Sequence, residues 1–184
     1  MAVEKVVILP CMGIGQPISG ITRLAAYIVN EDLLPGQTLI ECIPALIRGV
    51  KEDVDMAEQY PVIVIDGCPD KCASGICCTI GIKPIARLYA IDVIRETGLK
   101  PDNVRQEITE SGKKLARELS RQITEVAKEM LSDPGFQFQK QKLSIENRNI
   151  CQYDIDPDQT LGYVKINACW SRPESMPELA VFKK

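Results

Sequence analysis

The sequence predicts a small α/β domain with an open, mostly parallel sheet flanked by helices, followed by a C-terminal β-hairpin. Short apolar runs rich in β-branched residues alternate with segments whose apolar residues recur at helical spacing. One such run, residues 62–65, reads VIVI between Pro61 and Gly67, which is typical of a central strand buried on both faces. Strands that alternate with helices form parallel sheets, because right-handed crossovers return every strand in the same direction.

The elements follow from these patterns in chain order. Strands are expected at residues 5–9, 37–41, 62–65 and 86–92, and the pattern of the last one also suits a helix. Helices are expected over residues 21–29, through residues 50–57, from Pro69 onward and over residues 107–131. The last helix has an apolar stripe that predicts packing across the sheet; its members are Leu115, Leu119, Ile123, Val126 and Met130.

The C-terminal part of the chain shows a different pattern. Residues 148–154 and 160–170 resemble two strands joined by the turn-forming sequence Asp156-Pro157-Asp158. This predicts a hairpin appendage. We therefore expect an α/β domain over residues 1–133, including the long helix, and a hairpin extension over residues 134–184, which is a candidate surface for a protein partner.

Composition excludes several classes of function. The net charge of −3 over 184 residues, with both signs mixed along the chain, gives no electrostatic footprint for nucleic acid or for an acidic membrane surface. No apolar stretch approaches the ~20 residues that span a bilayer, and the first ten residues lack the apolar segment of a secretory signal. We expect a cytoplasmic protein without nucleic-acid or membrane partners.

Cysteine usage is the feature that points to chemistry. The chain has eight cysteines and no histidine. In a reducing compartment thiols persist, so structural disulfides are disfavoured. The absence of imidazole means that a bound transition metal must rely on sulfur, and it also excludes Ser-His-Asp and Cys-His catalytic arrangements. The composition favours a binding function over catalysis.

Three cysteines each follow an expected strand: Cys11 the first, Cys42 the second and Cys68 the third. The carboxyl ends of parallel strands share one edge of the sheet, so these thiols are expected to lie together there. Cys72 lies four residues beyond Cys68, and a helix starting at Pro69 would place both thiols on one helical face. Four thiolates suit tetrahedral zinc and equally suit a [4Fe-4S] cluster.

The tripeptide Asp66-Gly67-Cys68 after an apolar strand, with Cys72 beyond it and the loop of residues 11–15 (CMGIG) at the start, resembles the DGC-domain family. That family is described as zinc-binding, so the resemblance implies a small α/β domain over residues 3 to 100 with Cys11, Cys42, Cys68 and Cys72 as metal ligands. The chain also bears a looser similarity to the cluster-carrying small subunits of nickel-iron hydrogenases and complex I, whose sheets are flavodoxin-like. That similarity keeps the [4Fe-4S] alternative open.

Glycines after the first strand invite a nucleotide-binding interpretation, but the dinucleotide fingerprint requires glycine where Ile18 stands. Gly13 and Gly15 are instead expected to bring the backbone close to a metal centre and to offer N–H groups to thiolates. Asp66 is expected beside the centre, or as a cap of the following helix, and Gly67 is expected to line the same site.

Three functions remain from the sequence. The first is a zinc-binding protein without catalysis, and the second is a [4Fe-4S] electron-transfer or accessory subunit of a redox complex. The third is a thiol-based redox enzyme. The roles of Cys77, Cys78, Cys151 and Cys169 are left open, with packing as the default for a cysteine side chain.

Overall fold

The structure, a computed structural model, describes residues 3–101 and 103–145. The chain divides after Ile145 into two units, and the described residues belong to the first of them. The predicted hairpin of residues 148–170 lies outside the described residues.

Four parallel strands form a single sheet with the order β2-β1-β3-β4. The strands are β1 (Val6–Pro10), β2 (Thr38–Ile40), β3 (Val62–Asp66) and β4 (Ala86–Tyr89). The chain places β2 on one side of β1 and then returns to place β3 on the other side. The winding therefore reverses between β1 and β3, which is where open α/β sheets bind ligands.

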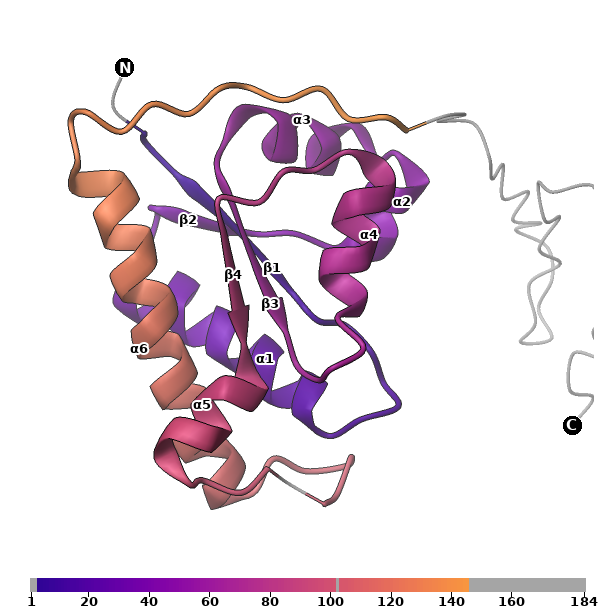
Figure 1. The fold of residues 1–184 in the computed structure, drawn as a ribbon, viewed down its shortest axis with the longest axis vertical. Coiled ribbons are helices and arrows are strands. Elements are labelled where there is room, and N and C mark those ends of the chain that lie inside the picture. The colour runs from indigo at the N-terminus through magenta and orange to yellow at the C-terminus, as the bar shows by residue number, and fades with distance from the viewer. Residues whose placement is uncertain (1–2, 102, 146–184) are drawn as a thin grey trace, which may run out of the picture. The chain divides into compact units, whose positions relative to one another are not determined.

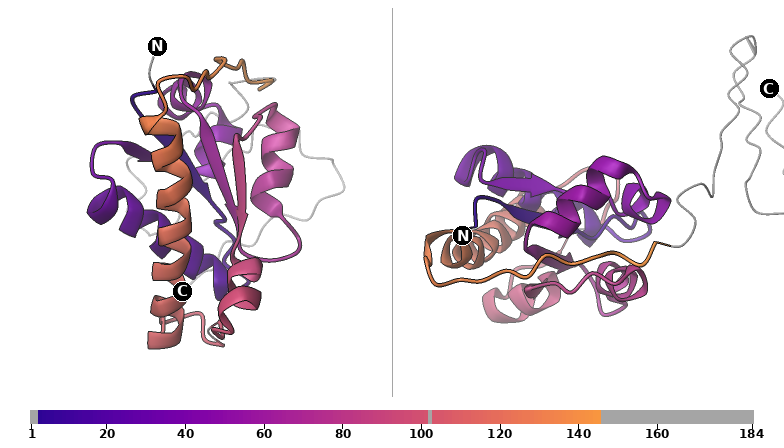
Figure 2. Two further views of the ribbon diagram at one scale, coloured as in Figure 1. Left: turned by 60° about the vertical axis from the view of Figure 1, so that its left-hand side comes forward. Right: turned by 90° about the horizontal axis from the view of Figure 1, so that it is seen from above.

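Helices cover both faces of the sheet (Figure 1). They are α1 (Ile18–Tyr27) with its π-helical continuation η1 (Ile28–Leu33), α2 (Ile43–Arg48), α3 (Lys51–Gln59), α4 (Cys72–Ile80), α5 (Ala90–Thr97) and α6 (Glu110–Ser132). Helices α1 and α6 pack on one face, with α5 against α6, whereas α2, α3 and α4 lie on the other (Figure 2).

The side chains of β1 and β3 alternate between two hydrophobic clusters. Val6 and Ile8 point toward α1 and α6, whereas Val7 and Leu9 point toward α2, α3 and α4. Every residue of β1 and of β3 is buried, which confirms the prediction that residues 62–65 form a central strand covered on both faces. The α/β fold class and the parallel sheet are thus as expected.

Several elements differ from their predicted extents. The fourth strand ends at Tyr89, and α5 begins at the next residue, so the apolar pattern of residues 86–92 was shared between a strand and a helix. The helical segment expected through residues 50–57 is α3, and a separate short helix, α2, precedes it, because Gly49 adopts a left-handed conformation (φ 75°) that ends α2 before α3 begins.

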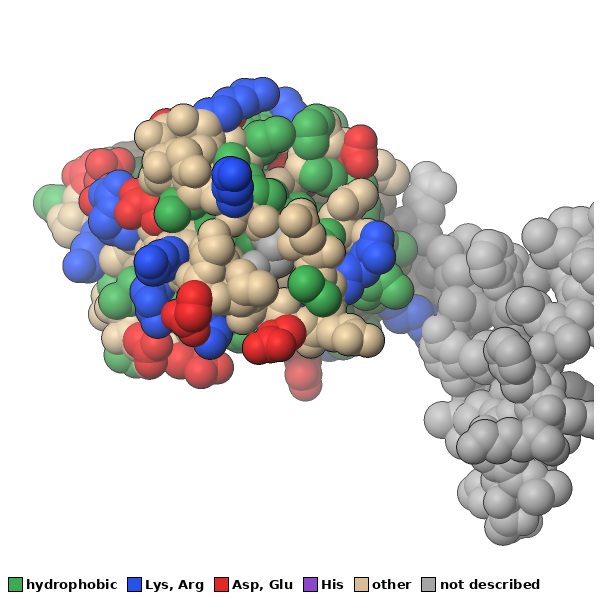
Figure 3. Space-filling model, turned by 90° about the horizontal axis from the view of Figure 1, so that it is seen from below, with side chains coloured by type: hydrophobic (Ala, Val, Ile, Leu, Met, Phe, Trp, Pro, Cys, Tyr) green, Lys and Arg blue, Asp and Glu red, His purple; other side chains and the backbone are tan. Residues whose placement is uncertain are grey.

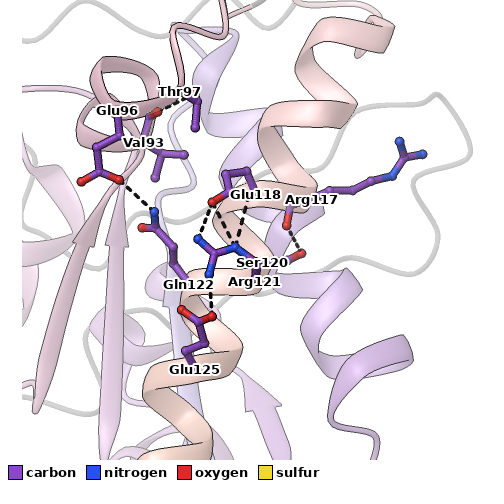
Figure 4. A network of polar contacts seen from close by, with 9 residues as sticks. All are labelled: Val93, Glu96, Thr97, Arg117, Glu118, Ser120, Arg121, Gln122 and Glu125. Carbon is purple, nitrogen blue, oxygen red and sulfur yellow. Dashed lines mark hydrogen bonds and ion pairs between the residues drawn. The ribbon is translucent and has the colours of Figure 1, made fainter.

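Helix α6 packs as its apolar stripe predicts. Leu115, Leu119, Ile123 and Met130 are buried in the cluster between α1 and the sheet, and Val126 is partly buried. On the outer face, Arg121 pairs with Glu118 and Glu125, and the Gln122 side chain donates a 3.1 Å hydrogen bond to Glu96 of α5 (Figure 4). Exposed ion pairs of this kind contribute little to stability, so the buried stripe is what holds α6 in place.

Candidate functional site

The two central strands deliver a cysteine each to the carboxyl edge of the sheet. Cys11 directly follows β1, and its backbone N–H donates a 2.8 Å hydrogen bond to the carbonyl oxygen of Ile65 in β3. Cys68 lies two residues beyond the end of β3. Cys11 is buried and Cys68 is half-buried.

The other two predicted ligands are more exposed. Cys42 is the N-cap residue of α2, two residues after the end of β2, and Cys72 is the first residue of α4. Both side chains are exposed. All four predicted ligands therefore follow strands or start helices near the same edge of the sheet, as the topology requires.

Helix α4 begins at Cys72 and not at Pro69, so the predicted helical face shared by Cys68 and Cys72 does not form. Residues 68–71 instead form a turn in which the N–H of Lys71 donates to the carbonyl oxygen of Cys68 (3.2 Å). Pro69 occupies the second position of this turn, where its fixed φ is favourable. A proline that suits the first turn of a helix suits a β-turn equally well, which is why the sequence did not separate the two.

Within residues 3–101 and 103–145, no three cysteine or carboxylate side chains form a group that could hold a metal ion. The six cysteines in this part of the chain are free thiols. Cys11 and Cys68 thus follow neighbouring strands at one edge of the sheet, but the described residues do not complete a set of donors. The four-cysteine ligand set stays a prediction.

Asp66 caps helix α4. Its buried carboxylate accepts hydrogen bonds from the backbone N–H groups of Ala73 (2.9 Å) and Ser74 (3.3 Å) and from the Ser74 hydroxyl (2.5 Å). The carboxylate thereby satisfies N–H groups at the start of α4 that lack a partner within the helix, and its charge is favourable at this end of the helix dipole. Of the roles expected for Asp66, capping is the one that these contacts supply.

The glycines of the site differ in what they do. A Cβ on Gly67 would lie 3.0 Å from Cγ2 of Ile18, so the absence of a side chain lets the end of β3 approach the first turn of α1. A Cβ on Gly13 would meet the Cys11 sulfur at 3.9 Å, an ordinary contact that places the Gly13 backbone beside this thiol. Gly15 has open space around it. The packing of Ile18 thus explains why residue 67 has no side chain. The Gly13 backbone lies close to a candidate ligand, Cys11.

Lys71 is a feature of the site that sequence patterns do not reveal. Its backbone adopts the left-handed conformation (φ 50°), which is costly for residues with a Cβ. Its ammonium group lies over the ring of Tyr89, 4.6 Å from the centroid, at the end of β4. A lysine in the sequence carries no signal for a left-handed backbone.

The environment of the thiols sets their protonation. For Cys68, a backbone hydrogen bond at Asp70 lowers the pKa, but burial and the charges of Asp70 and Cys11 together raise it above its usual value. Burial, followed by the charge of Asp66, raises the pKa of Cys77 to about 12. Cys77 belongs to α4 and its side chain is buried in the core, so it is a packed, protonated thiol. Its neighbour Cys78 is exposed.

A cleft of about 520 Å³ opens beside Cys68. Ile18 of α1, Ile91 and Ile94 of α5, and Arg105 are among the residues that line it. Arg105 donates a 2.7 Å hydrogen bond to the carbonyl oxygen of Gly15, which ties the loop after β1 to the segment before α6. Figure 3 views the molecule from the side at which the strands end, where positive and negative side chains are interspersed.

No helix within the described part of the chain is both long and apolar enough to cross a lipid bilayer.

Comparison with known proteins gives one finding about the family. Residues 7–114, more than half of the 184, match the DGC domain. Searches of curated proteins and of solved structures found no match. The matched range contains Cys11, Cys42, Cys68 and Cys72 together with the Asp66-Gly67-Cys68 tripeptide. The chain belongs to the DGC domain family, a cysteine-containing domain whose composition is compatible with metal binding.

Proposed function

We propose that this protein binds one zinc ion through the thiolates of Cys11, Cys42, Cys68 and Cys72 at the carboxyl edge of the sheet. The observation that carries the proposal is the position of Cys11 and Cys68. They follow the two adjacent central strands at the point where the winding reverses, which is the ligand-binding position of open α/β sheets.

The chemistry of the donor set supports a sulfur-binding metal. The chain contains no imidazole, and the cysteines of the described residues are free thiols. Zinc accepts four thiolates in a tetrahedral arrangement, and a coordinated thiol loses its proton. A bound cation would therefore favour the thiolate forms of the four cysteines.

The exposure of the ligands favours exchange of the metal over a purely structural role. Cys11 is buried, but Cys42 and Cys72 are exposed, so half of the ligand set is accessible to an incoming thiol ligand. Closed structural zinc sites in contrast shield all four of their ligands and contribute directly to folding. We propose that the protein holds zinc for transfer, without catalysing a reaction at the site.

Elemental analysis of the full chain purified without oxygen tests this proposal. A zinc protein is colourless and contains about one zinc ion per chain, whereas a [4Fe-4S] protein is brown and a thiol enzyme carries no metal. Cys68→Ser is expected to lose most of the zinc. Cys78→Ser is the matched control, because Cys78 is an exposed cysteine of α4 outside the ligand set. Equal zinc content in the two variants would contradict the assignment of Cys68.

A further inference from the structure

The cleft beside Cys68 lies where open α/β sheets bind small molecules. Its lining comes from segments that follow three strands of the sheet: the loop after β1, the loop after β3, and helix α5 after β4. The winding of the sheet reverses between β1 and β3, which leaves a crevice outside the ends of these strands. The volume of about 520 Å³ is in the range of clefts that hold a small organic ligand.

The walls of the cleft are mostly apolar. Proline and isoleucine side chains make up more than half of the described residues that line it: Pro17, Ile18, Pro69, Ile91, Ile94 and Pro101. The three isoleucines are half-buried, so part of each side chain is still open to the cleft. An apolar group that covers this surface is removed from water, which favours binding.

Arg105 gives the cleft a positive charge. It lies in the segment between α5 and α6, which runs beneath the ends of the strands (Figure 1), and its Nε donates a 2.7 Å hydrogen bond to the carbonyl oxygen of Gly15. Among the described residues that line the cleft, it is the only charged one. Asp70, whose carboxylate accepts a 3.7 Å hydrogen bond from the Cys68 thiol, is not part of the lining.

We infer that this cleft binds a small organic carboxylate with an apolar body. The carboxylate pairs with the guanidinium group of Arg105, and the apolar body lies against Ile18, Ile91 and Ile94. One guanidinium matches the single charge of a carboxylate, whereas a phosphate monoester carries about two negative charges at neutral pH. The inference goes beyond the proposed zinc function and does not depend on it, because none of these contacts involves a metal.

Cys68 provides a readout of occupancy, because it lines the cleft. Metal-free full chain is labelled with N-ethylmaleimide, and peptide mass mapping gives the labelling rate of each cysteine. Octanoate, as the probe, should slow the labelling of Cys68. It should not slow the labelling of Cys78, an exposed cysteine of α4 that does not line the cleft. A labelling rate of Cys68 that octanoate leaves unchanged would overturn the inference.

Two further probes separate the features of the ligand. Octan-1-ol has the apolar body without the charge, and acetate has the charge without the apolar body. Octanoate should halve the labelling rate of Cys68 at a concentration roughly tenfold lower than either of them, since the charged hydrogen bond and the buried chain both add to affinity. Equal protection by octan-1-ol would overturn the preference for a carboxylate, and equal protection by acetate would overturn the apolar contribution.

Substitutions of Arg105 test the source of the charge. Arg105→Gln should remove the preference for octanoate over octan-1-ol, whereas Arg105→Lys, which keeps the charge, should retain it. Arg117→Gln is the matched control, because Arg117 is an exposed arginine of α6 outside the cleft. An unchanged preference in Arg105→Gln, or its loss in Arg105→Lys, would overturn the role assigned to this charge. All of these measurements use metal-free chain, so their outcome and that of the zinc proposal are separate.

Discussion

The carboxylate of Asp66, the last residue of β3, accepts a 2.9 Å hydrogen bond from the backbone N–H of Ala73 in the first turn of α4. This bond ties the end of a central strand to the start of the next helix. The three residues of the Asp66-Gly67-Cys68 tripeptide thus have separate tasks. Asp66 caps α4, Gly67 allows the close approach of α1, and Cys68 carries the candidate ligand.

Replacement of Asp66 by alanine should lower the free energy of unfolding by about 2 kcal/mol, because N–H groups at the start of α4 lose a buried acceptor. Chemical denaturation of the metal-free chain measures the change. Asp92→Ala is the control, since Asp92 forms an exposed pair with Arg95 and should change stability by less than about 0.5 kcal/mol. A similar small effect for both variants would contradict the capping role.

The Gly67→Ala substitution should lower the free energy of unfolding by about 1–3 kcal/mol, because the new Cβ would lie 3.0 Å from Cγ2 of Ile18. The branched side chain of Ile18 has little rotameric freedom in a helix. Gly75→Ala provides the opposite case. Gly75 lies inside α4 with open space around it, so alanine should stabilise the helix by up to about 1 kcal/mol. The midpoint of thermal unfolding should therefore fall for Gly67→Ala and rise for Gly75→Ala. A midpoint that moves in the same direction for both variants would refute the packing argument.

Much of the fold could be predicted from local patterns. The VIVI run of residues 62–65 identified a strand covered on both faces, because only such a strand tolerates unbroken apolar residues. The helical spacing from Leu115 to Met130 identified α6. The positions of Cys11 and Cys68 at one edge then followed from the parallel topology alone.

The parts that sequence patterns missed depend on backbone conformation and on distant contacts. Asp66 makes its bonds across seven and eight residues, and these bonds fix the start of α4 at Cys72. The left-handed conformation of Lys71 has no sequence signature, since lysine is not a residue that favours it. The same turn determines how Cys68 and Cys72 lie relative to each other, so their shared face could not be predicted correctly.

Glu41 should make stability depend on pH. Its side chain is completely buried. Burial, followed by the charge of Asp53, raises the pKa of Glu41 from 4.5 to about 9. Between these two values the folded chain keeps a proton that the unfolded chain releases. Stability should therefore fall as pH rises, by on the order of 2 kcal/mol between pH 5 and pH 7.

Urea unfolding of the metal-free chain across this pH range measures the effect. Glu41→Gln should remove most of the pH dependence, because the amide does not titrate. Glu31→Gln, at an exposed position, should leave it unchanged. If the Glu41→Gln variant keeps the pH slope of the unsubstituted chain, another group is responsible.

Thiol reactivity should separate the cysteines of the described residues into two groups. Cys77 is buried with a pKa of about 12, so it should resist alkylation by iodoacetamide at pH 8 in the folded, metal-free chain. The exposed thiols of Cys42, Cys72 and Cys78 should be modified. Peptide mass mapping after labelling identifies each site, and denaturant should expose Cys77. Labelling of Cys77 at the rate of Cys78 in the folded chain would contradict its place in the core.

X-ray absorption at the zinc edge of the zinc-loaded full chain tests the central claim most directly. Zinc held by Cys11, Cys42, Cys68 and Cys72 should show a first shell of about four sulfur neighbours at about 2.3 Å. Substitution of Cys68 by serine should lower the sulfur number or prevent loading. A first shell of nitrogen or oxygen neighbours at about 2.0–2.2 Å, with no change on substitution of Cys68, would contradict a thiolate centre at this edge of the sheet.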